Sequence, residues 1–280
     1  MVEGLLLIDK PAAITSHDAV DRVRRAIGLR KIGHSGTLDP MATGLLVMGV
    51  GRATRLLRFL GGLAKGYQGA GVLGVETSTL DGDGDVVRES RVDVTRNQLE
   101  RGMSRFVGAI EQRPPMYSAV KVGGEKLYRL ARKGADVEAP SRTVHVFEFS
   151  LRRFDTPRFE FRVRCSSGTY VRSLVADLGT SLGCGAHVSS LRRTSIGPFG
   201  VDEATPPHDP GPVLPLERAV EHLAAVTLDE EEARVASHGS CLGPAGIEGP
   251  YQALDPNGRL IGIYQDDGAK AVPQVILAPV

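Results

Sequence analysis

The chain of 280 residues is 41% hydrophobic and 24% charged, the balance of a folded globular protein, which excludes a disordered or collagen-like chain. No apolar run approaches the roughly 18 residues of a membrane-spanning helix, so no membrane partner is expected. The three cysteines, Cys165, Cys184 and Cys241, have no C-x-x-C spacing, which argues against disulfides and a cysteine zinc site and favours the cytoplasm. Residues 224–280 carry eight acidic and three basic side chains, a net charge of −5, against +6 for residues 1–223. This asymmetry fits either a polyanion partner for the basic part or an ordinary solvated surface.

Hydrophobic periodicity predicts a mixture of strands and helices in the first 200 residues. Strands are expected at residues 5–8, 44–50, 147–151 and 159–165, and helices at 19–27 and 170–182. Between residues 47 and 60, an apolar stripe carries Arg52, Arg55 and Arg58 at intervals of three. These elements show no regular β-α-β alternation, so the sequence predicts an α+β fold rather than a doubly wound parallel sheet.

A cluster of prolines divides the chain. Five prolines and Gly211 fall within residues 206–215, a density that neither a helix nor a strand interior accepts. A short helix is expected at residues 216–223, followed by a helix that starts near Asp229 and ends near His238. Residues 251–254 and 260–264 predict a hairpin, and residues 272–277 predict a further strand. We therefore expect a large domain at residues 1–223 and a small β-rich domain at residues 224–280.

Three short patterns resemble known sites but lack what those sites need. Residues 69–74 match G-x-G-x-x-G, but the residues after them cannot form the helix that a dinucleotide site requires. Asp81, Asp83 and Asp85 begin like a calcium loop, but Val86 and Val92 replace its glycine and glutamate, which leaves an acidic turn. Residues 33–37 lack the last glycine of a nucleophile elbow. No histidine spacing indicates a metal site.

Asp39 is the candidate catalytic residue that remains. Residues 33–44 surround this single carboxylate with small residues, and Pro40 restricts Asp39 to an extended conformation. The glycines of the segment allow another backbone or a ligand to come close. A carboxylate between the apolar strands expected at residues 5–8 and 44–50 needs a partner if it is buried. Taken alone, the pattern is more typical of a turn than of a catalyst.

The same segment resembles the active-site motif of the TruB family of pseudouridine synthases. Residues 33–44 are similar to G-H-x-G-T-L-D-P-x-A-x-G, and residues 10–16 to K-P-x-x-x-T-S. Further similarities, in the family's order, lie at residues 65–67 (K-x-Y), 73–84 (L-G-x-x-T-x-T-x-D-x-x-G), 114–121 (P-P-x-Y-S-A-x-K), 165–172 (C-S-S-G-T-Y-I-R) and 191–194 (L-R-R-T). Gly69 and Gly71 depart from the family pattern, and the acidic C-terminal part resembles its PUA module only loosely.

The resemblance implies a fold, a reaction and a set of site residues. The implied fold has a mixed, largely antiparallel central sheet, an RNA-gripping thumb segment at residues 114–142 and a PUA-like C-terminal domain. The implied reaction isomerises uridine 55 in the TΨC loop of tRNA, with Asp39 as nucleophile or base and Arg172 as the cation that lowers its pKa. Because a base in a folded loop must be flipped out, substrate-binding side chains are needed. The implied ones are His34, Tyr67, Tyr170, Arg172 and Leu191.

Basic residues are expected to hold the RNA backbone, which gives salt-dependent affinity rather than specificity. They are Lys10, Lys65, Lys121, Lys126, Arg129, Arg132 and Lys133. The T-arm of tRNA is the implied partner; no cofactor, metal or protein partner is implied, and the chain is expected to act as a monomer. The alternative is a non-catalytic RNA-binding protein or tRNA-folding chaperone of the same architecture, and Asp39, Tyr67 and Arg172 together favour the enzyme.

Overall fold

The computed structural model describes residues 2–118, 120–127, 130 and 139–277, and two main sheets of nine and four strands make up its frame. The strands of the larger sheet are β1 (Gly4–Lys10), β2 (Ile32–Ser35), β3 (Thr43–Val50), β4 (Lys65–Leu73), β7 (Gly108–Gln112), β10 (Arg142–Asp155), β11 (Arg158–Cys165), β12 (Ala186–Ile196) and β13 (Phe199–Gly200). Their order is β1-β3-β12-β4-β11-β10-β7, with β2 paired to β3 and β13 to β12. These pairings are antiparallel except that of β3 with β12, so the expected mixed, largely antiparallel sheet is confirmed.

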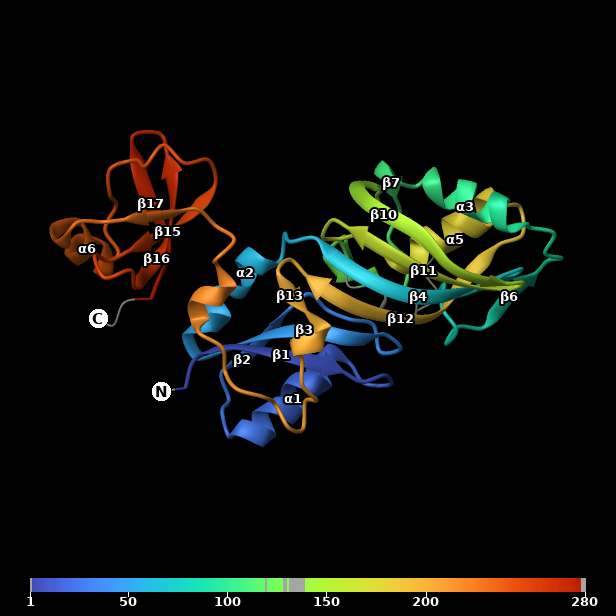
Figure 1. Cartoon of the computed structure of the whole chain (residues 1–280), viewed down its shortest axis with the longest axis horizontal. Coiled ribbons are helices and arrows are strands. Elements are labelled where there is room, and N and C mark those ends of the chain that lie inside the picture. The colour runs from blue at the N-terminus through green and yellow to red at the C-terminus, as the bar shows by residue number, and fades with distance from the viewer. Residues whose placement is uncertain (1, 119, 128–129, 131–138, 278–280) are drawn as a thin grey trace.

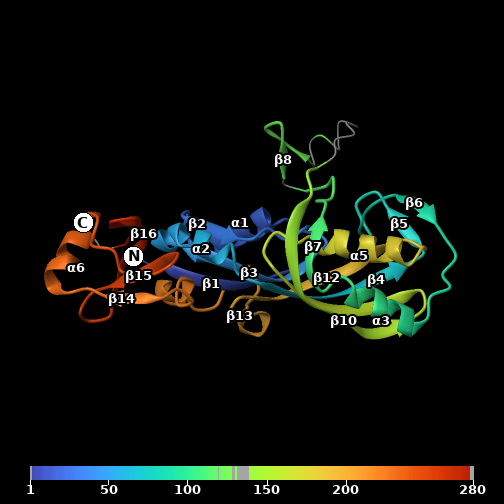
Figure 2. The same cartoon turned by 90° about the horizontal axis from the view of Figure 1, so that it is seen from above.

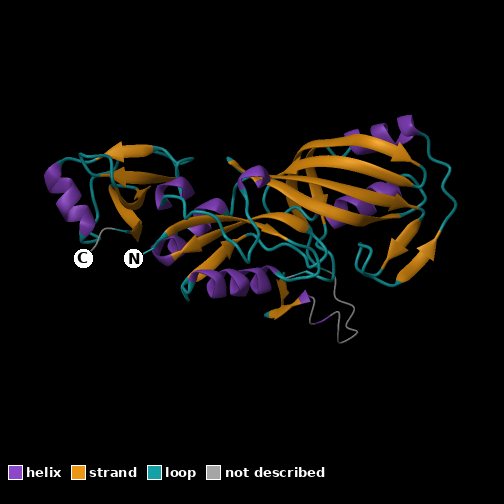
Figure 3. Cartoon of the chain, turned by 60° about the horizontal axis from the view of Figure 1, so that its bottom comes forward, coloured by secondary structure: helices purple, strands orange, loops and turns teal. Residues whose placement is uncertain are grey.

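Helices cover the faces of the larger sheet, as Figure 3 shows. They are α1 (Ser16–Ile27), η1 (Gly51–Arg55), α2 (Leu57–Leu60), α3 (Arg96–Ser104), α5 (Val171–Ser181), η2 (Val201–Glu203) and η3 (Leu216–Ala219), where η denotes a 3-10 helix. A capping box of Thr15 and Asp18 starts α1, whose apolar stripe is buried against β1 and β3. The apolar face of α5 is buried in a second cluster with β4, β10, β11 and β12. Both helices lie where the periodicity predicted them.

The C-terminal part forms the smaller sheet, at one end of the elongated molecule (Figure 1). Its elements are β14 (Ala225–Thr227), α6 (Glu230–Ser237), β15 (Pro250–Leu254), β16 (Leu260–Asp267) and β17 (Lys270–Ile276). The predicted hairpin and last strand are confirmed, and Asp229 caps α6 at the predicted start. The helix expected at residues 216–223 is only the single turn η3, which ends because the backbone of Val220, with φ −130°, leaves the helical conformation.

The proline-rich segment lies along β1 and connects two packed bodies. Leu5 and Leu214 exchange two backbone hydrogen bonds of 2.9 and 2.8 Å, and the N–H of Asp9 donates to the carbonyl of Thr205 at 2.8 Å. One apolar cluster contains residues of both sheets, among them Leu45 and Val275. The smaller sheet is therefore packed against the larger one rather than tethered by a free linker.

Two short ribbons complete the described part of the chain: β5 (Val75–Thr77) with β6 (Val86–Glu89), and β8 (Lys121–Val122) with β9 (Glu125–Lys126). Figure 2 shows β8 projecting from the body of the molecule, within the segment expected to be the thumb.

Gly69 and Gly71 lie inside β4, opposite two phenylalanines of β11. A Cβ on Gly71 would lie 2.4 Å from the ring of Phe159, its cross-strand partner, and one on Gly69 would lie 2.7 Å from the ring of Phe161. The rings occupy the space that side chains would need. The G-x-G-x-x-G pattern thus reflects aromatic packing in a strand, and the prediction that it is no dinucleotide site agrees with this placement.

Candidate active site

Asp39 lies where the two halves of the larger sheet meet. The halves join through β3 and β12, whose parallel register links only Thr43 with Arg192 and Gly44 with Arg193. Asp39 belongs to the loop that leads from β2 into β3. A Cβ on Gly44 would lie 2.3 Å from the carbonyl oxygen of Arg193, and the φ angle of Gly44 is +100°, so only glycine fits here. Small residues next to Asp39 therefore let the strands approach each other at this site.

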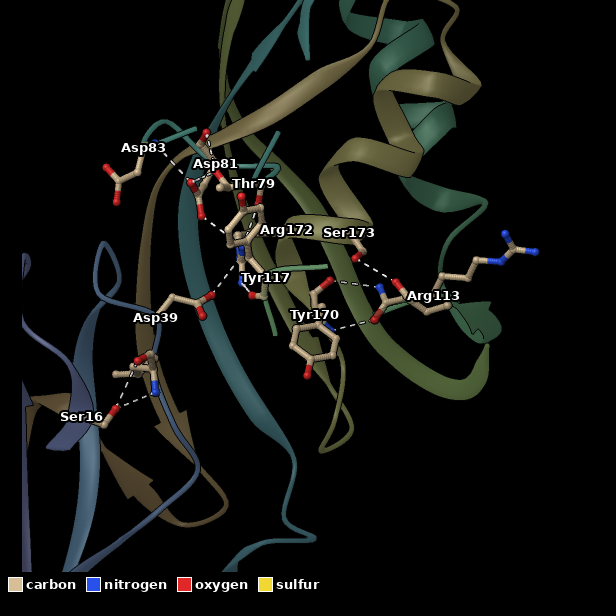
Figure 4. Close-up of polar contacts among 12 residues, drawn as sticks. Ser16, Asp39, Thr79, Asp81, Asp83, Arg113, Tyr117, Tyr170, Arg172 and Ser173 are labelled. Atoms are coloured by element: carbon tan, nitrogen blue, oxygen red, sulfur yellow. Dashed lines mark hydrogen bonds and ion pairs between the residues drawn. The ribbon is translucent and has the colours of Figure 1, made fainter. Parts of the chain in front are cut away.

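A buried arginine holds the carboxylate of Asp39 (Figure 4). Nε of Arg172 lies 2.9 Å from Oδ2 of Asp39, and Nη1 lies 3.2 Å from Oδ2 of Asp81. The exposed fraction of the side chain is 3% for Arg172, 7% for Asp81 and 34% for Asp39. Arg172 also donates to the carbonyl oxygens of Thr79, at 2.7 Å, and Tyr117, at 3.0 Å. The guanidinium is thus fixed by four partners, and Asp39 is the partner that stays open to a substrate.

Burial and charge act in opposite directions on the carboxyl group of Asp39. The loss of water around it raises its pKa above the ordinary value of 3.8, and the neighbouring carboxylate of Asp81 adds to the rise. The cations Arg172 and Lys10 lower the pKa, but the net direction is upward. The sequence predicted the sign of the Arg172 contribution; the structure shows that burial outweighs it.

Ser16 and Lys10 fix the backbone on both sides of Asp39. Oγ of Ser16 accepts a hydrogen bond from the N–H of Leu38 at 2.8 Å and donates to its carbonyl at 3.2 Å. Nζ of Lys10 donates to three carbonyl oxygens, among them that of Pro40 at 3.2 Å. Because Lys10 has 0% exposed surface, burial lowers its pKa to about 8. The residues of the K-P-x-x-x-T-S segment therefore hold the loop that carries Asp39.

Lys10 and Lys65 do not face solvent, which corrects the expectation that they bind the RNA backbone. Lys65 is 7% exposed, and its Nζ donates to the carbonyl oxygens of Gly61 at 3.2 Å and Leu63 at 3.1 Å. Burial lowers the pKa of Lys65 to about 8. A buried ammonium group bound to carbonyls is not available to a phosphate, so we assign both lysines to the support of loops at the site.

Tyr67 and Leu191 lie together beside the Asp39 loop. Both are 7% exposed and belong to one apolar cluster with Leu38, the residue before Asp39. Leu191 also lies in the wall of a cavity of about 950 Å³, which is lined on the loop side by Met41. Burial raises the pKa of the Tyr67 phenol, so the phenol is neutral at physiological pH.

His34 and Tyr170 belong to different elements of the larger domain. His34 lies in β2, and among the described residues its buried Nδ1 has no hydrogen-bond partner. Burial lowers the pKa of His34, and the charges of Arg193 and His17 act in the same direction, so the imidazole is neutral at pH 7. Tyr170 directly precedes α5.

The remaining basic residues that we expected to bind RNA fall in the thumb segment. Lys121 lies in β8 and Lys126 in β9. Arg129, Arg132 and Lys133 lie outside the described residues.

Neither a metal cluster nor a membrane helix is found in the part of the chain that the structure describes. No group of three His, Cys, Asp or Glu side chains there is arranged to hold a metal ion. None of the helices there is long and apolar enough to cross a membrane.

Two residues of the site were missed from the sequence. Asp81 lies in the expected acidic turn, between β5 and β6, but the sequence did not indicate that its carboxylate is buried against Arg172. Arg193, 1% exposed, donates from Nε to the carbonyl of Leu45 at 2.8 Å and from Nη2 to that of Gly36 at 2.9 Å, and so ties β12 to the Asp39 loop. Both residues stand in segments that carry the family resemblance: Asp81 is the D of residues 73–84, and Arg193 is the second R of residues 191–194. The resemblance was therefore the signal in the sequence that could have identified them.

Comparison with known families gives matches along almost the whole chain. Residues 24–171 match the family described as TruB family pseudouridylate synthase (N terminal domain). Residues 172–209 match the tRNA pseudouridylate synthase B C-terminal domain, and residues 223–278 match tRNA Pseudouridine synthase II, C terminal.

Individual proteins resemble the chain over nearly its full length. A tRNA pseudouridine synthase B of Thermobifida fusca (strain YX) is 43% identical over 291 residues, covering 99% of each chain. One of Mycobacterium tuberculosis (strain CDC 1551 / Oshkosh) is 41% identical over 286 residues, covering 99% of this chain and 96% of the other. Among solved structures, a chain from a Cbf5-Nop10-Gar1 complex has a TM-score of 0.76 at 27% identity, covering 98% of this chain and 84% of that one.

Proposed function

The chain belongs to the TruB family of pseudouridylate synthases, and from this membership and the geometry around Asp39 we infer that it isomerises uridine 55 in the TΨC loop of tRNA. It is an enzyme that converts uridine to pseudouridine, and tRNA is the substrate that the names of its relatives give. The observation that carries the proposal is the 2.9 Å ion pair of Asp39 with Arg172 at the joint of the larger sheet.

Asp39 is the group to which we assign the chemistry. Isomerisation breaks the N-glycosidic bond, turns the base and joins its C5 to the ribose. The carboxylate of Asp39 either attacks as nucleophile or removes a sugar proton as base, and both roles require its ionised form. Arg172 favours that form and restricts the carboxylate to one position. Because the product contains the same atoms as the substrate, the proposal needs no cofactor.

The apolar side chains beside Asp39 are assigned to the flipped base. A uridine in a folded loop has to leave its stack before a carboxylate can reach it. We assign Tyr67 to stack on the uracil, Leu191 to form the pocket wall, and Tyr170 to contact the nucleotide. The neutral imidazole of His34 is assigned to the space that the uridine leaves. The shared cluster of Tyr67, Leu191 and Leu38 supports this arrangement.

We propose a division of labour between two parts of the chain. Residues 1–223 carry the chemistry, with a thumb at residues 114–142 that holds the T-arm, and residues 224–280 are a PUA-like module that adds contacts farther along the tRNA. The net charges support this division, because residues 1–223 carry +6, which attracts RNA phosphates, whereas residues 224–280 carry −5. We also propose that the chain works as a monomer in the cytoplasm, without a protein partner, and that it assists tRNA folding.

Tritium release from tRNA transcripts labelled at C5 of uridine tests this function. Forming the new bond at C5 displaces the tritium, so the proposal expects about one equivalent released per transcript. A transcript with cytidine at position 55 should release none.

Release from the cytidine-55 transcript would show that another uridine is the target. Binding of the transcript without any release would favour the alternative of a non-catalytic RNA-binding or tRNA-folding protein. Both outcomes contradict the proposal, and nuclease mapping of the product identifies the modified position.

A further inference from the structure

Helix α5, which carries Arg172, starts without a side-chain cap. Its N-cap residue is Tyr170, which forms no capping hydrogen bond, and the first turn contains no acidic residue. The first turn of a helix leaves backbone N–H groups without partners, and a loose end frays. No side chain at the start of the helix thus holds the backbone of Tyr170, two residues before Arg172.

Gln112 supplies that hold from the end of β7. Its Nε2 donates to the carbonyl oxygen of Tyr170 at 3.0 Å, and its Oε1 accepts from the N–H of the same residue at 2.7 Å. Gln112 is 1% exposed, so the amide is removed from water and both of its hydrogen bonds go to this one residue. In Figure 4, two dashed lines at the backbone of Tyr170 mark these hydrogen bonds.

Three further contacts reach the start of α5 from Arg113, which follows β7, and from Arg142, the first residue of β10. Oγ of Ser173 donates to the carbonyl of Arg113 at 3.0 Å. Arg142, the cross-strand partner of Gln112, donates to the carbonyl of Gly168, and its guanidinium carbon lies 4.9 Å from the centre of the Tyr170 ring. These contacts and those of Gln112 are called the β7–α5 clamp below.

The residues that the clamp binds lie before and after Arg172 in the chain. Tyr170 and Ser173 are held on either side of it, while its side chain reaches Asp39 at 2.9 Å and Asp81 at 3.2 Å. A small displacement of this turn moves the guanidinium relative to both carboxylates. Misplacement of a catalytic group by about 1 Å costs on the order of 100-fold in rate.

We propose that Gln112 is a positioning residue of this enzyme, which sets the place of Arg172 and Tyr170 by binding the backbone at the start of α5. The proposal rests on the function proposed above, in which Asp39 and Arg172 act on the uridine. Both side-chain hydrogen bonds of Gln112 go to the backbone of Tyr170, so Gln112 acts on Arg172 through that backbone.

The test compares Gln112→Met with Gln252→Met in the full chain. Methionine keeps the length of the side chain and removes the amide. Gln252 is the matched control, because its Nε2 donates to the carbonyl of Leu223 at 3.0 Å, in the C-terminal part of the molecule. We expect kcat of Gln112→Met on a T-arm hairpin to fall about 10- to 100-fold, with KM within about twofold, and both constants of Gln252→Met to stay near wild type.

The pH profile separates positioning from a loss of folded protein. The groups that set the pKa of Asp39 are Arg172, Asp81 and Lys10, besides burial. If Arg172 moves away, the pKa of Asp39 rises, because a cation that lowers it is lost, and the acidic limb of kcat against pH shifts upward. Partial unfolding reduces kcat without moving the limb.

Each outcome bears on the proposal. An unchanged kcat and limb in a folded Gln112→Met protein would overturn it, as would an equal loss in Gln252→Met. If Gln112→Met does not fold, Ser173→Ala removes a single bond of the clamp and should shift the limb in the same direction by a smaller amount; no shift there overturns the proposal. An inactive wild-type protein would instead contradict the proposed function, so the two failures are distinguishable.

Discussion

The joint around Asp39 and the boundary between the two sheets are both held by arginines, but with different partners. At the joint, Arg172 binds two carboxylates, those of Asp39 and Asp81. At the boundary, Arg55 and Arg58 donate to the carbonyl oxygens of Ile276 and Gln274, each at 2.6 Å. Arg52 donates to the carbonyl of Leu277 in the same way.

The partners explain what each region tolerates. Any residue in β17 offers a carbonyl, so the boundary depends on the arginines and on the apolar cluster beneath them, which includes Leu56 and Val275. The arginines also cover the free edge of the smaller sheet. At the joint, Asp39 and Asp81 both depend on the one guanidinium of Arg172. We therefore expect single substitutions to have large effects at the joint and small effects at the boundary.

Of the three substitutions that test the difference between the two regions, Arg172→Ala should reduce kcat the most. It leaves the buried carboxylate of Asp81 without its cation, at a cost of about 3–5 kcal/mol, and we expect kcat to fall about 100-fold or more. Arg172→Lys restores the charge without the planar fork and should recover only part of the rate. Steady-state kinetics on a T-arm hairpin measures both. A loss confined to RNA affinity would show that the ion pair is not part of the chemistry.

Asp81→Asn should have an intermediate effect and a diagnostic sign. The amide weakens the hold on Arg172, and we expect kcat to fall about tenfold. The carboxylate of Asp81 raises the pKa of Asp39, so its removal lowers that pKa, and the acidic limb of kcat should move to lower pH. Arg172→Ala should move the same limb to higher pH. Shifts of the same sign in both variants would contradict the assigned electrostatics.

The double substitution Arg55→Ala/Arg58→Ala should have the smallest effect. Both side chains are exposed, and losing their hydrogen bonds should lower the free energy of unfolding by about 1 kcal/mol. KM for full-length tRNA should rise about threefold, while kcat on the hairpin stays unchanged. Arg25→Ala/Arg30→Ala, which alters two exposed arginines at the end of α1, is the control. A large loss of kcat on the hairpin would mean that the boundary contributes to the active site.

Most elements could be predicted because their pattern lies in a few neighbouring residues. The alternation at residues 159–165 predicts β11, and the spacing at residues 170–182 predicts α5. The division of the chain was predicted from the prolines, but the contacts across the boundary were not, because carbonyl acceptors leave no trace in the sequence. The spacing of Arg52, Arg55 and Arg58 was visible, but its partners were not.

The site could be predicted in part, for a related reason. Asp39 and Arg172 stand in segments whose letters resemble a family, so their pairing was expected and the structure brings them together. The burial of Lys10 and Lys65 was not visible, since a lysine in a motif reads as a charge for solvent or phosphate. Asp81 was missed because three alternate aspartates look like a turn, and only the fold shows which one faces Arg172.

Asp39→Asn tests the central claim most directly, with turnover and binding measured on one preparation. The amide has nearly the same shape but serves neither as nucleophile nor as base. We predict a loss of tritium release of at least about 1,000-fold, with Kd for the T-arm hairpin within about twofold of wild type, because we assign phosphate binding to other residues. Turnover near the wild-type rate in this variant would show that Asp39 is not the catalyst.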